Sequence, residues 1–362
     1  MRIAIGAIVR TLGGPATYAA ELAAALAARR TPGIEYVILT DGPEAFASAG
    51  VRVEHVPLVT PYAQVLWDHL RIPAALRRVG ADLYHGTKNT LPALLPCPAV
   101  VTIHDLAVYH HPQSFARLQR WHLRTHTPHA VRVARAVLTV SEHAAADLRA
   151  RFPAAAAKVH VVPNGVSPRF APVTDGAALA AFRRRHGLGD GPLVAYLGTL
   201  QPRKNVELLA AAFGRVAAVV PDAELVLAGR IRPGYRPSLP GARVRLIGPL
   251  VAEELPLFYG AAAVLASPSL YEGFGLTLLE AMACGCPVVA LKRSAVPEVV
   301  GEAAVLLDDA SEDALAAALT RVLAEPAFAA DLRARGLVRA RRFSWERAAE
   351  ATEAVYLRCA PH

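Results

Sequence analysis

The segment 268–280, which reads PSLYEGFGLTLLE, places two glutamates and two glycines directly after a short apolar run. Gly273 and Gly275 let the backbone approach a ligand closely and keep its amide groups accessible. A helix predicted to begin after the second glycine adds the positive end of its dipole, so the turn is suited to an anion such as a phosphate. Glu272 before the turn and Glu280 one turn into the helix can accept hydrogen bonds from the hydroxyl groups of a sugar and of a ribose. The alternative is an ordinary helix start, in which a glutamate only complements the dipole.

A second loop, GTLQPRKN at 198–205, follows the apolar run 193–197 and precedes a helix predicted to begin at Val206. Arg203 and Lys204 stand side by side in it, and lysine is rare here, since the 39 basic residues comprise 35 arginines and 4 lysines. A point charge beside a planar guanidinium matches the oxygens of a diphosphate. We therefore expect both side chains to bind a diphosphate. A solvated turn is the alternative.

Two further features lie in the first half of the chain. His104, which is followed by Asp105, comes directly after the run 101–103, where it could donate a hydrogen bond to a sugar oxygen or orient an acceptor. A histidine with a structural role is the alternative. Gly13 and Gly14 follow the first apolar run and precede a predicted helix, which by itself is a weak indication of a phosphate-binding loop.

Several other chemistries have no support in the sequence. No Asp-x-Asp triplet occurs, so we expect no Mg²⁺ or Mn²⁺ held against a diphosphate by paired carboxylates, and no other metal site. There is neither a GxSxG nucleophile turn nor a P-loop. The four cysteines form no CxxC pair and have no zinc-ligand spacing, which argues against a disulfide scaffold and favours the reducing cytoplasm.

Short β-branched runs alternate with Ala- and Leu-rich stretches along the chain, a pattern that predicts parallel sheets covered by helices. In the first half we expect strands at 3–9, 36–39, 51–55, 83–85, 99–103, 136–140 and 159–162. In the second half we expect them at 193–197, 224–228, 244–247, 264–267, 287–291 and 305–307. Helices are expected at 18–29, 144–150, 312–324, 327–342 and 344–357. The predicted fold class is α/β with two doubly wound parallel sheets, whose strands carry the ligand-binding loops at their carboxyl ends.

Length and composition support this organisation. A chain of 362 residues favours two domains, and the segment 162–174, which is dense in turn formers, is the best linker. With 54% hydrophobic and 19% charged residues the chain is not disordered. No apolar run approaches the ~20 residues that a membrane-spanning helix needs. The run Ile3–Val9 ends at Arg10 without a cleavage site, so we expect a strand there and not a signal peptide.

The net charge of +9 is concentrated in the first half. Residues 1–170 hold 18 Lys and Arg against 10 Asp and Glu, a net charge of +8, whereas 171–362 hold 21 against 20, a net charge of +1. A basic domain suits a nucleic acid, but no motif or aromatic platform for one is present.

Between Leu106 and Ser141 there is no acidic residue, and a helix with a basic face could meet an anionic membrane or a lipid-diphosphate acceptor. A solvated Arg-rich helix is the alternative. The basic and apolar residues of this segment are Arg117, Arg120, Arg124, Arg132, Arg135, Phe115, Leu118, Trp121 and Leu123.

Together these motifs resemble the group 1 (family 4) retaining glycosyltransferases of GT-B fold, and the likeness runs from Ile3 to the C-terminus. The segment 268–286 looks like that family's E-x7-E motif. Four other motifs match the family in order and spacing, namely VPNG at 162–165, GTLQPRKN at 198–205, PEV at 297–299 and FSW at 343–345.

The resemblance implies two Rossmann-like domains that face a central cleft. An acceptor-side domain would span 1–168, a nucleotide-sugar domain 169–343, and a last helix within 344–362 would cross back to the first domain. Arg203 and Lys204 would neutralise the donor diphosphate, and His104 would reach the transferred sugar. The donor site would also include Gly14, Gly198, Thr199, Leu250, Glu272, Gly273, Phe274, Gly275, Leu276, Thr277 and Glu280.

The reaction that this family likeness implies is a metal-independent transfer of a hexose by front-face displacement, with retention of configuration. The expected co-substrate is GDP-mannose, with UDP-glucose second, and no other cofactor is needed. The acceptor would be a glycan or a polyprenyl- or other lipid-linked molecule, and the protein would be cytoplasmic, with peripheral contact to the inner face of the plasma membrane as an open option. Two alternatives remain: a GT-B-fold nucleotide-sugar epimerase, and a non-catalytic partner subunit that binds a nucleotide sugar.

Overall fold

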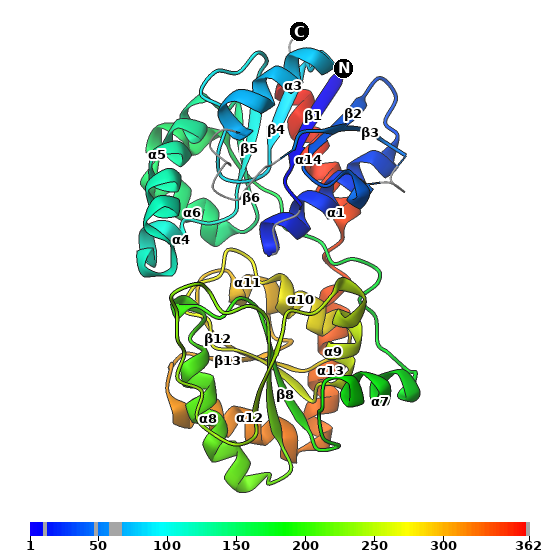
Figure 1. Ribbon diagram of the computed structural model, residues 1–362, viewed down its shortest axis with the longest axis vertical. Coiled ribbons are helices and arrows are strands. Elements are labelled where there is room, and N and C mark those ends of the chain that lie inside the picture. The colour runs from blue at the N-terminus through cyan, green and yellow to red at the C-terminus, as the bar shows by residue number, and fades with distance from the viewer. Residues whose placement is uncertain (10–12, 47–49, 58–66, 360–362) are drawn as a thin grey trace. The chain divides into compact units, whose positions relative to one another are not determined.

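The chain forms two compact units, which Figure 1 shows as ribbons of the computed structural model. The structure describes residues 1–9, 13–46, 50–57 and 67–359. The first unit comprises Met1–Gly165 together with Ser344–His362, and the second comprises Val166–Phe343. The first crossing between units therefore falls three residues before the boundary at 168/169 that the sequence suggested.

The first unit contains a seven-stranded sheet of order β3-β2-β1-β4-β5-β6-β7, in which every neighbouring pair is parallel. The chain winds outward from β1 to β3 and then continues from β4 on the other side of β1, which is the predicted doubly wound arrangement. Because helices cover both faces, the central strands β1, β4, β5 and β6 are almost entirely buried, whereas the edge strand β3 is mostly polar and is exposed or half-buried. The strands are β1 (Arg2–Ala7), β2 (Glu35–Thr40), β3 (Arg52–His55), β4 (Leu83–Gly86), β5 (Ala99–Ile103), β6 (Ala136–Thr139) and β7 (Val159–Val161).

The helices of the first unit begin and end where the local sequence allows. Ser141 caps α6, since its hydroxyl accepts a hydrogen bond from the amide of Ala144 at 3.1 Å. Gly80, in the left-handed conformation, ends α3. The helices are α1 (Gly14–Arg29), α3 (Ile72–Val79), α4 (Ala107–His110), α5 (Arg117–Val133), α6 (Glu142–Arg151) and α14 (Trp345–Cys359), with short helical turns at Pro43–Phe46, Trp67–Arg71, Pro112–Ser114 and Pro153–Lys158.

Helix α14 is the last element of the chain and belongs to the first unit. It is anchored by the buried carboxylate of Glu353, whose Oε2 accepts hydrogen bonds from Thr31 and Tyr36, each at 2.7 Å. The Arg29 guanidinium pairs with the other oxygen at 3.1 Å. Together with this ion pair, the two hydroxyl groups lower the pKa of Glu353, although burial alone would raise it. Polar contacts thus add to apolar packing in holding α14 against α1.

The second unit repeats the architecture with a six-stranded parallel sheet of order β10-β9-β8-β11-β12-β13. Its strands are β8 (Leu193–Leu197), β9 (Glu224–Ala228), β10 (Val244–Gly248), β11 (Val264–Ser267), β12 (Val288–Leu291) and β13 (Val305–Leu307). Its helices are α7 (Gly176–Arg185), α8 (Val206–Val219), α9 (Leu255–Ala261), α10 (Leu276–Ala283), α11 (Val296–Val300), α12 (Glu312–Ala324) and α13 (Pro326–Ala340), with turns at Pro202–Lys204 and Ala252–Glu254. All thirteen strands expected from the sequence are present, with ends that differ by at most two residues.

The chain passes between the units twice, at Gly165–Val166 and at Phe343–Ser344. On the side of the first unit, Gly165 lies against the backbone of Trp345 so closely that a Cβ atom there would stand 2.1 Å from the Trp345 nitrogen. On the side of the second unit, the amide of Val166 donates a hydrogen bond to the carbonyl of Phe343 at 3.3 Å. The two crossings are therefore neighbours in each unit.

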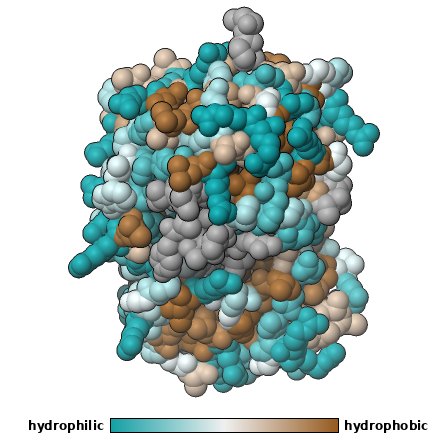
Figure 2. Space-filling view, turned by 45° about the horizontal axis from the view of Figure 1, so that its top comes forward, coloured by the Kyte–Doolittle hydropathy of each residue, from teal (hydrophilic) through white to brown (hydrophobic). Residues whose placement is uncertain are grey.

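Within the part of the chain that the structure describes, no helix combines the length and the apolar character needed to cross a bilayer. On the face seen in Figure 2, apolar side chains form several separate patches among hydrophilic ones.

Candidate functional site

The loops that follow β8 and β11 meet at the carboxyl edge of the second sheet, because these two strands are neighbours. The amide of Leu270 donates a hydrogen bond to the carbonyl of Arg203 at 2.9 Å, and the Arg203 guanidinium donates one to the carbonyl of Tyr271 at 2.7 Å. Asn205, in the left-handed conformation with φ 52°, ends the turn that carries the two basic residues and starts α8. The two loops singled out in the sequence are thus bonded to each other.

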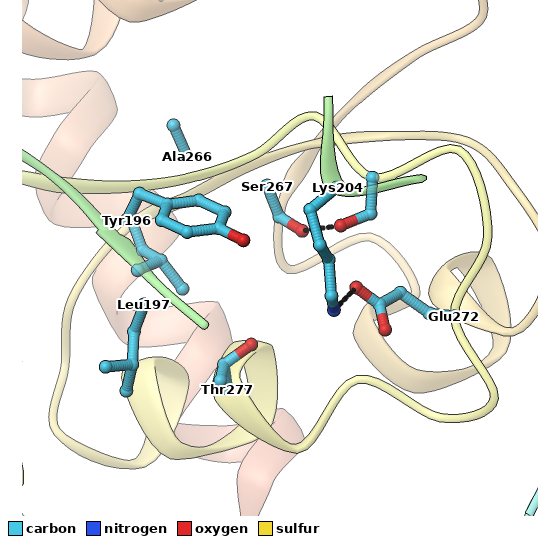
Figure 3. A pocket seen from close by; sticks show the side chains of 9 residues that line it. Tyr196, Leu197, Lys204, Ala266, Ser267, Glu272 and Thr277 are labelled. Carbon is cyan, nitrogen blue, oxygen red and sulfur yellow. Dashed lines mark hydrogen bonds and ion pairs between the residues drawn. The ribbon is translucent and has the colours of Figure 1, made fainter. Parts of the chain in front are cut away.

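Lys204 and Glu272 form a short hydrogen-bonded ion pair between these loops (Figure 3). The Arg203 guanidinium lies 3.6 Å from the second oxygen of the same carboxylate. Only 15% of either basic side chain and 11% of the Glu272 side chain are exposed to solvent. Burial would raise the pKa of Glu272, but Lys204 and Arg203 outweigh it and hold this pKa below its usual value. The site therefore contains two cations and one anion in a shielded position.

A narrow hollow lies beside this ion pair at the ends of β8 and β11 (Figure 3). Thr277, at the start of α10, points into it, as does Tyr196 from β8. The residues that line it are Tyr196, Leu197, Lys204, Leu265, Ala266, Ser267, Ser269, Glu272 and Thr277.

The glycine turn lies between Glu272 and α10, and the helix begins after the second glycine as the sequence predicted. Gly275 has φ 106°, which an L side chain rarely adopts, and it directly precedes α10. No side chain caps this helix, so its first amide groups and its dipole are directed at the turn. Gly273, Phe274 and Leu276 complete the turn, with Phe274 buried against the ring of Phe343.

The main chain of Glu272 is held by a loop that sequence analysis did not single out. Ser294 lies between β12 and α11, and its hydroxyl accepts a hydrogen bond from the Glu272 amide at 2.7 Å. The carbonyl of Glu272 accepts one from the amide of Ala295 at 3.4 Å. Nothing in the local sequence marks Ser294, because its role depends on β12 lying next to β11.

Glu280 is buried in α10, with 7% of its surface exposed, and its carboxylate accepts a hydrogen bond from the Tyr259 hydroxyl at 2.7 Å. Tyr259, on α9, is a second residue that the sequence did not reveal. In α10, Leu278, Leu279, Ala281, Met282 and Ala283 are buried as well, while Leu276 is only half-buried. Elements pack around most of this helix, so apolar residues occur on several of its faces.

The remaining donor-site residues of the second unit lie along the same sheet edge. Gly198 follows β8, and Gly229 after β9 approaches its carbonyl so closely that a Cβ would stand 2.0 Å from the oxygen. The carbonyl of Thr199 accepts a hydrogen bond from the Tyr196 hydroxyl at 3.4 Å. Leu250 is half-buried in the loop after β10, and does not line the hollow beside Glu272.

His104 and Gly14 lie in the first unit, after β5 and after β1 respectively. The Nε2–H of His104 donates a hydrogen bond to the carbonyl of Thr87 at 2.8 Å, and its amide donates one to Asn89 at 2.9 Å. Burial lowers the pKa of His104 to about 4, so the ring is neutral at pH 7 and Nδ1 carries a lone pair. The ring is therefore set up to accept a hydrogen bond from a hydroxyl group, rather than to donate one. The edge of Tyr18, with ring centroids 4.7 Å apart, fixes its orientation.

The structure thus brings Arg203, Lys204, Glu272 and Thr277 together in the second unit and places His104 and Gly14 in the first. In the described ranges, no group of three or more His, Cys, Asp or Glu side chains has an arrangement that could hold a metal ion.

Comparison with known proteins gives matches over both units. Residues 12–170 match the family described as glycosyltransferase family 4, and residues 191–325 match the family described as glycosyl transferases group 1. The O-antigen chain mannosyltransferase B of Escherichia coli is 31% identical over 284 residues, which cover 75% of this chain and 73% of that protein. A GDP-mannose-dependent alpha-(1-6)-phosphatidylinositol monomannoside mannosyltransferase of Mycolicibacterium smegmatis is 35% identical over 211 residues, 54% of either chain. The chain therefore spans about three quarters of the first relative and about half of the second.

Solved structures resemble the whole chain. A sucrose-phosphate synthase from Thermosynechococcus elongatus has a TM-score of 0.74 at 25% identity, covering 99% of this chain and 98% of that one. HepE of Anabaena in complex with UDP-glucose has a TM-score of 0.76 at 20% identity, covering 99% of this chain and 100% of that one. At 20% identity the second likeness concerns the fold alone.

Proposed function

The chain belongs to the group 1 (family 4) glycosyltransferases and has their GT-B fold, and from this premise we propose that it transfers a hexose, mannose, from a nucleoside-diphosphate sugar to a glycan or lipid-linked acceptor. The observation that carries the proposal is the set of Arg203, Lys204 and Glu272 at one shielded sheet edge. The two cations suit the diphosphate, and the carboxylate suits the hydroxyl groups of the sugar. Glu280 is proposed to bind the ribose and His104 to accept a hydrogen bond from the transferred sugar.

The proposed reaction breaks the bond between the anomeric carbon and the β-phosphate oxygen. Negative charge then builds on the leaving diphosphate, where Arg203 and Lys204, already beside it in the bound complex, stabilise it. We propose that the acceptor oxygen attacks from the same face, that its proton passes to the departing phosphate oxygen, and that configuration is retained. The cations already present do the work that a divalent metal does in other transferases, so the reaction is proposed to be metal-independent.

A transfer assay tests this reaction. The protein is incubated with GDP-mannose and a panel of free and lipid-linked mannosides, with and without excess EDTA, and the anomeric configuration of the product is measured by NMR. We expect an α-linked product at an unchanged rate in EDTA. Inversion, or loss of activity in the chelator, would contradict the mechanism. Conversion of the donor without an acceptor into another free nucleotide sugar would indicate an epimerase, and binding without turnover a partner subunit.

The donor base is proposed to be guanine. The two relatives described above are both named mannosyltransferases, which supports mannose, and the second is named as GDP-mannose-dependent. We expect GDP to raise the melting temperature more than UDP or ADP does, because stabilisation grows as RT ln(1 + [L]/Kd). A thermal-shift panel at equal concentrations measures this. A larger shift with UDP would move the assignment to UDP-glucose.

We also propose that the first unit meets an anionic membrane or a lipid-diphosphate acceptor through α5. Leu118 and Trp121 lie one helical turn apart and are 57% and 58% exposed, next to the exposed Arg117 and Arg124. An apolar pair flanked by cations suits the surface of a bilayer that contains anionic lipids.

Sedimentation with vesicles tests this contact. At low salt we expect the protein to pellet with vesicles of phosphatidylglycerol and phosphatidylcholine but not with phosphatidylcholine alone. The double variant Leu118→Ser, Trp121→Ser is expected to stay in solution. Val219→Ser, which changes an exposed residue of the second unit, serves as the control and should pellet like the wild type. If the wild-type protein does not pellet with the anionic vesicles, the membrane contact is wrong and α5 is a solvated helix.

A further inference from the structure

We propose that the Lys204–Glu272 ion pair makes the protein discriminate between the intact sugar donor and the nucleoside diphosphate that remains after transfer. This inference rests on the proposed function and assigns a binding preference to the same site. Its basis is that the cation expected to bind the diphosphate is already paired with the carboxylate expected to bind the sugar.

The pair is shielded from water, so separating its members has a high free-energy cost. With 15% and 11% of their side chains exposed, Lys204 and Glu272 gain little from solvent when they part. The Arg203 guanidinium, 3.6 Å away, is the other cation near this carboxylate. A diphosphate drawn to either cation competes directly with Glu272 and brings negative charge close to it.

The intact donor supplies a new partner to both Lys204 and Glu272 when their ion pair separates. Its phosphate oxygens replace the carboxylate beside Lys204, and the hydroxyl groups of its sugar donate hydrogen bonds to the carboxylate. The free nucleoside diphosphate supplies a new partner to Lys204 but, without a sugar, none to Glu272. It leaves Glu272 buried, without its cation and next to an anion, which is an unfavourable state for a carboxylate. The ion pair therefore weakens binding of the product more than binding of the donor, and its re-formation favours product release.

Protonation of Glu272 relieves the unfavourable state. The groups that face this carboxylate are Lys204 and Arg203 from the loop after β8, the hydroxyl of Ser269 from its own loop, and Tyr196 from β8. In the unliganded protein the two cations keep the pKa of Glu272 below its usual value. A diphosphate that engages them raises this pKa, so the complex takes up a proton. The terminal phosphate of the free nucleoside diphosphate also titrates, at about pH 6, and releases a proton when it binds cations. The proton uptake that belongs to Glu272 is therefore the difference between the wild type and a Glu272→Gln variant, which lacks only the carboxyl group.

Calorimetry on the full-length protein tests the inference. GDP, UDP and their mannose and glucose conjugates are titrated at pH 5.5, 6.5 and 7.5, in buffers of different ionisation enthalpy that report proton uptake. With the nucleoside diphosphate we expect the wild type to take up more protons than Glu272→Gln does, and with the donor we expect a smaller difference. Glu272→Gln keeps the shape of the side chain without its charge. This variant should bind the nucleoside diphosphate about tenfold more tightly than the wild type does, and should not gain affinity for the donor.

Glu224→Gln is the matched control, because it removes a similarly shielded carboxylate, 13% exposed, that lies at the start of β9 and pairs with Arg245 instead of Lys204. It should not tighten binding of the nucleoside diphosphate. Unchanged or weaker binding of the nucleoside diphosphate to Glu272→Gln, or equal proton uptake by this variant and the wild type, would overturn the inference and leave the proposed function intact. If neither nucleoside diphosphate nor donor binds to the wild type, the proposed function fails, and this inference with it.

Discussion

Lys204→Ala is expected to lower kcat/KM for sugar transfer about 10²–10³-fold, which is the typical cost of removing one fixed group that stabilises developing charge. The ammonium group lies in a site where water is largely excluded, with 15% of the side chain exposed. Its charge therefore acts on the leaving diphosphate with little screening. The loss should fall mainly on kcat, because the charge on the diphosphate is greatest in the transition state. Steady-state kinetics with the donor chosen by the thermal-shift panel measure the effect.

Lys292→Ala is the control for Lys204→Ala. Lys292 is another of the four lysines of the chain, is 51% exposed and pairs with Asp308 at the surface. The Lys292→Ala variant should transfer sugar at the wild-type rate. Thermal melting of both variants separates a catalytic loss from a folding defect, since Lys204→Ala also deprives the buried Glu272 of its closer cation and leaves Arg203 at 3.6 Å. Wild-type-like transfer by Lys204→Ala would exclude this residue from the catalytic machinery.

Gly165→Ala is expected to reduce the free energy of unfolding by about 3 kcal/mol or more, at the upper end of the effect of overpacking. The added Cβ atom would stand 2.1 Å from the nitrogen of Trp345 and 2.3 Å from the carbonyl carbon of Ser344. Both are backbone atoms of the segment that returns to the first unit, so no side-chain rotation relieves the clash. Urea unfolding monitored by circular dichroism measures the change.

A second glycine variant shows whether the clash, rather than the loss of a glycine, causes the effect. Gly214 lies inside α8, is exposed and has no atom within 4 Å of a built Cβ. Gly214→Ala should therefore stabilise the protein by up to about 1 kcal/mol, since alanine favours the helix. Equal stability of Gly165→Ala and the wild type would contradict the close packing of the two crossings.

The central strands were predictable because burial on both faces demands continuous apolar runs, and these runs are bounded by residues that favour turns. The run at 99–103 followed by His104 and the run at 264–267 followed by Pro268 are examples. Helix starts were less regular. The first helix begins at Gly14, four residues before the start that we expected at 18. The sequence did not reveal this start because the first turn of the helix has no acidic residue to mark it.

The charged members of the site were also predictable from local sequence. Arg203, Lys204, Glu272 and Glu280 lie in loops or helix starts that come after strands, where parallel sheets bind ligands. The ion pair between Lys204 and Glu272 was not predictable, because the two residues are 68 positions apart and meet only through the pairing of β8 with β11. The same holds for Ser294 and Tyr259, which hold Glu272 and Glu280 but carry no local signature.

The tautomer of His104 is a further case that needed the folded chain. The sequence places an imidazole at the end of a strand and allows it either to donate or to accept a hydrogen bond. The carbonyl of Thr87, at the end of the neighbouring strand β4, fixes the proton on Nε2. Burial keeps the ring neutral, so only acceptance by Nδ1 remains for a ligand at pH 7.

The sequence by itself determined the α/β fold class, the thirteen strands and the identity of the charged residues, because all of these depend on local periodicity and on the residue types at the carboxyl end of each strand. The tertiary structure decided which charges neutralise each other, which nitrogen of His104 carries the proton and where a side chain has no room beside Gly165. These properties depend on atoms that lie far apart in the chain and approach within a few ångströms only when the sheets have formed. Because burial strengthens electrostatic and steric effects at such distances, tertiary contacts set the chemistry of residues whose identity the sequence already gives.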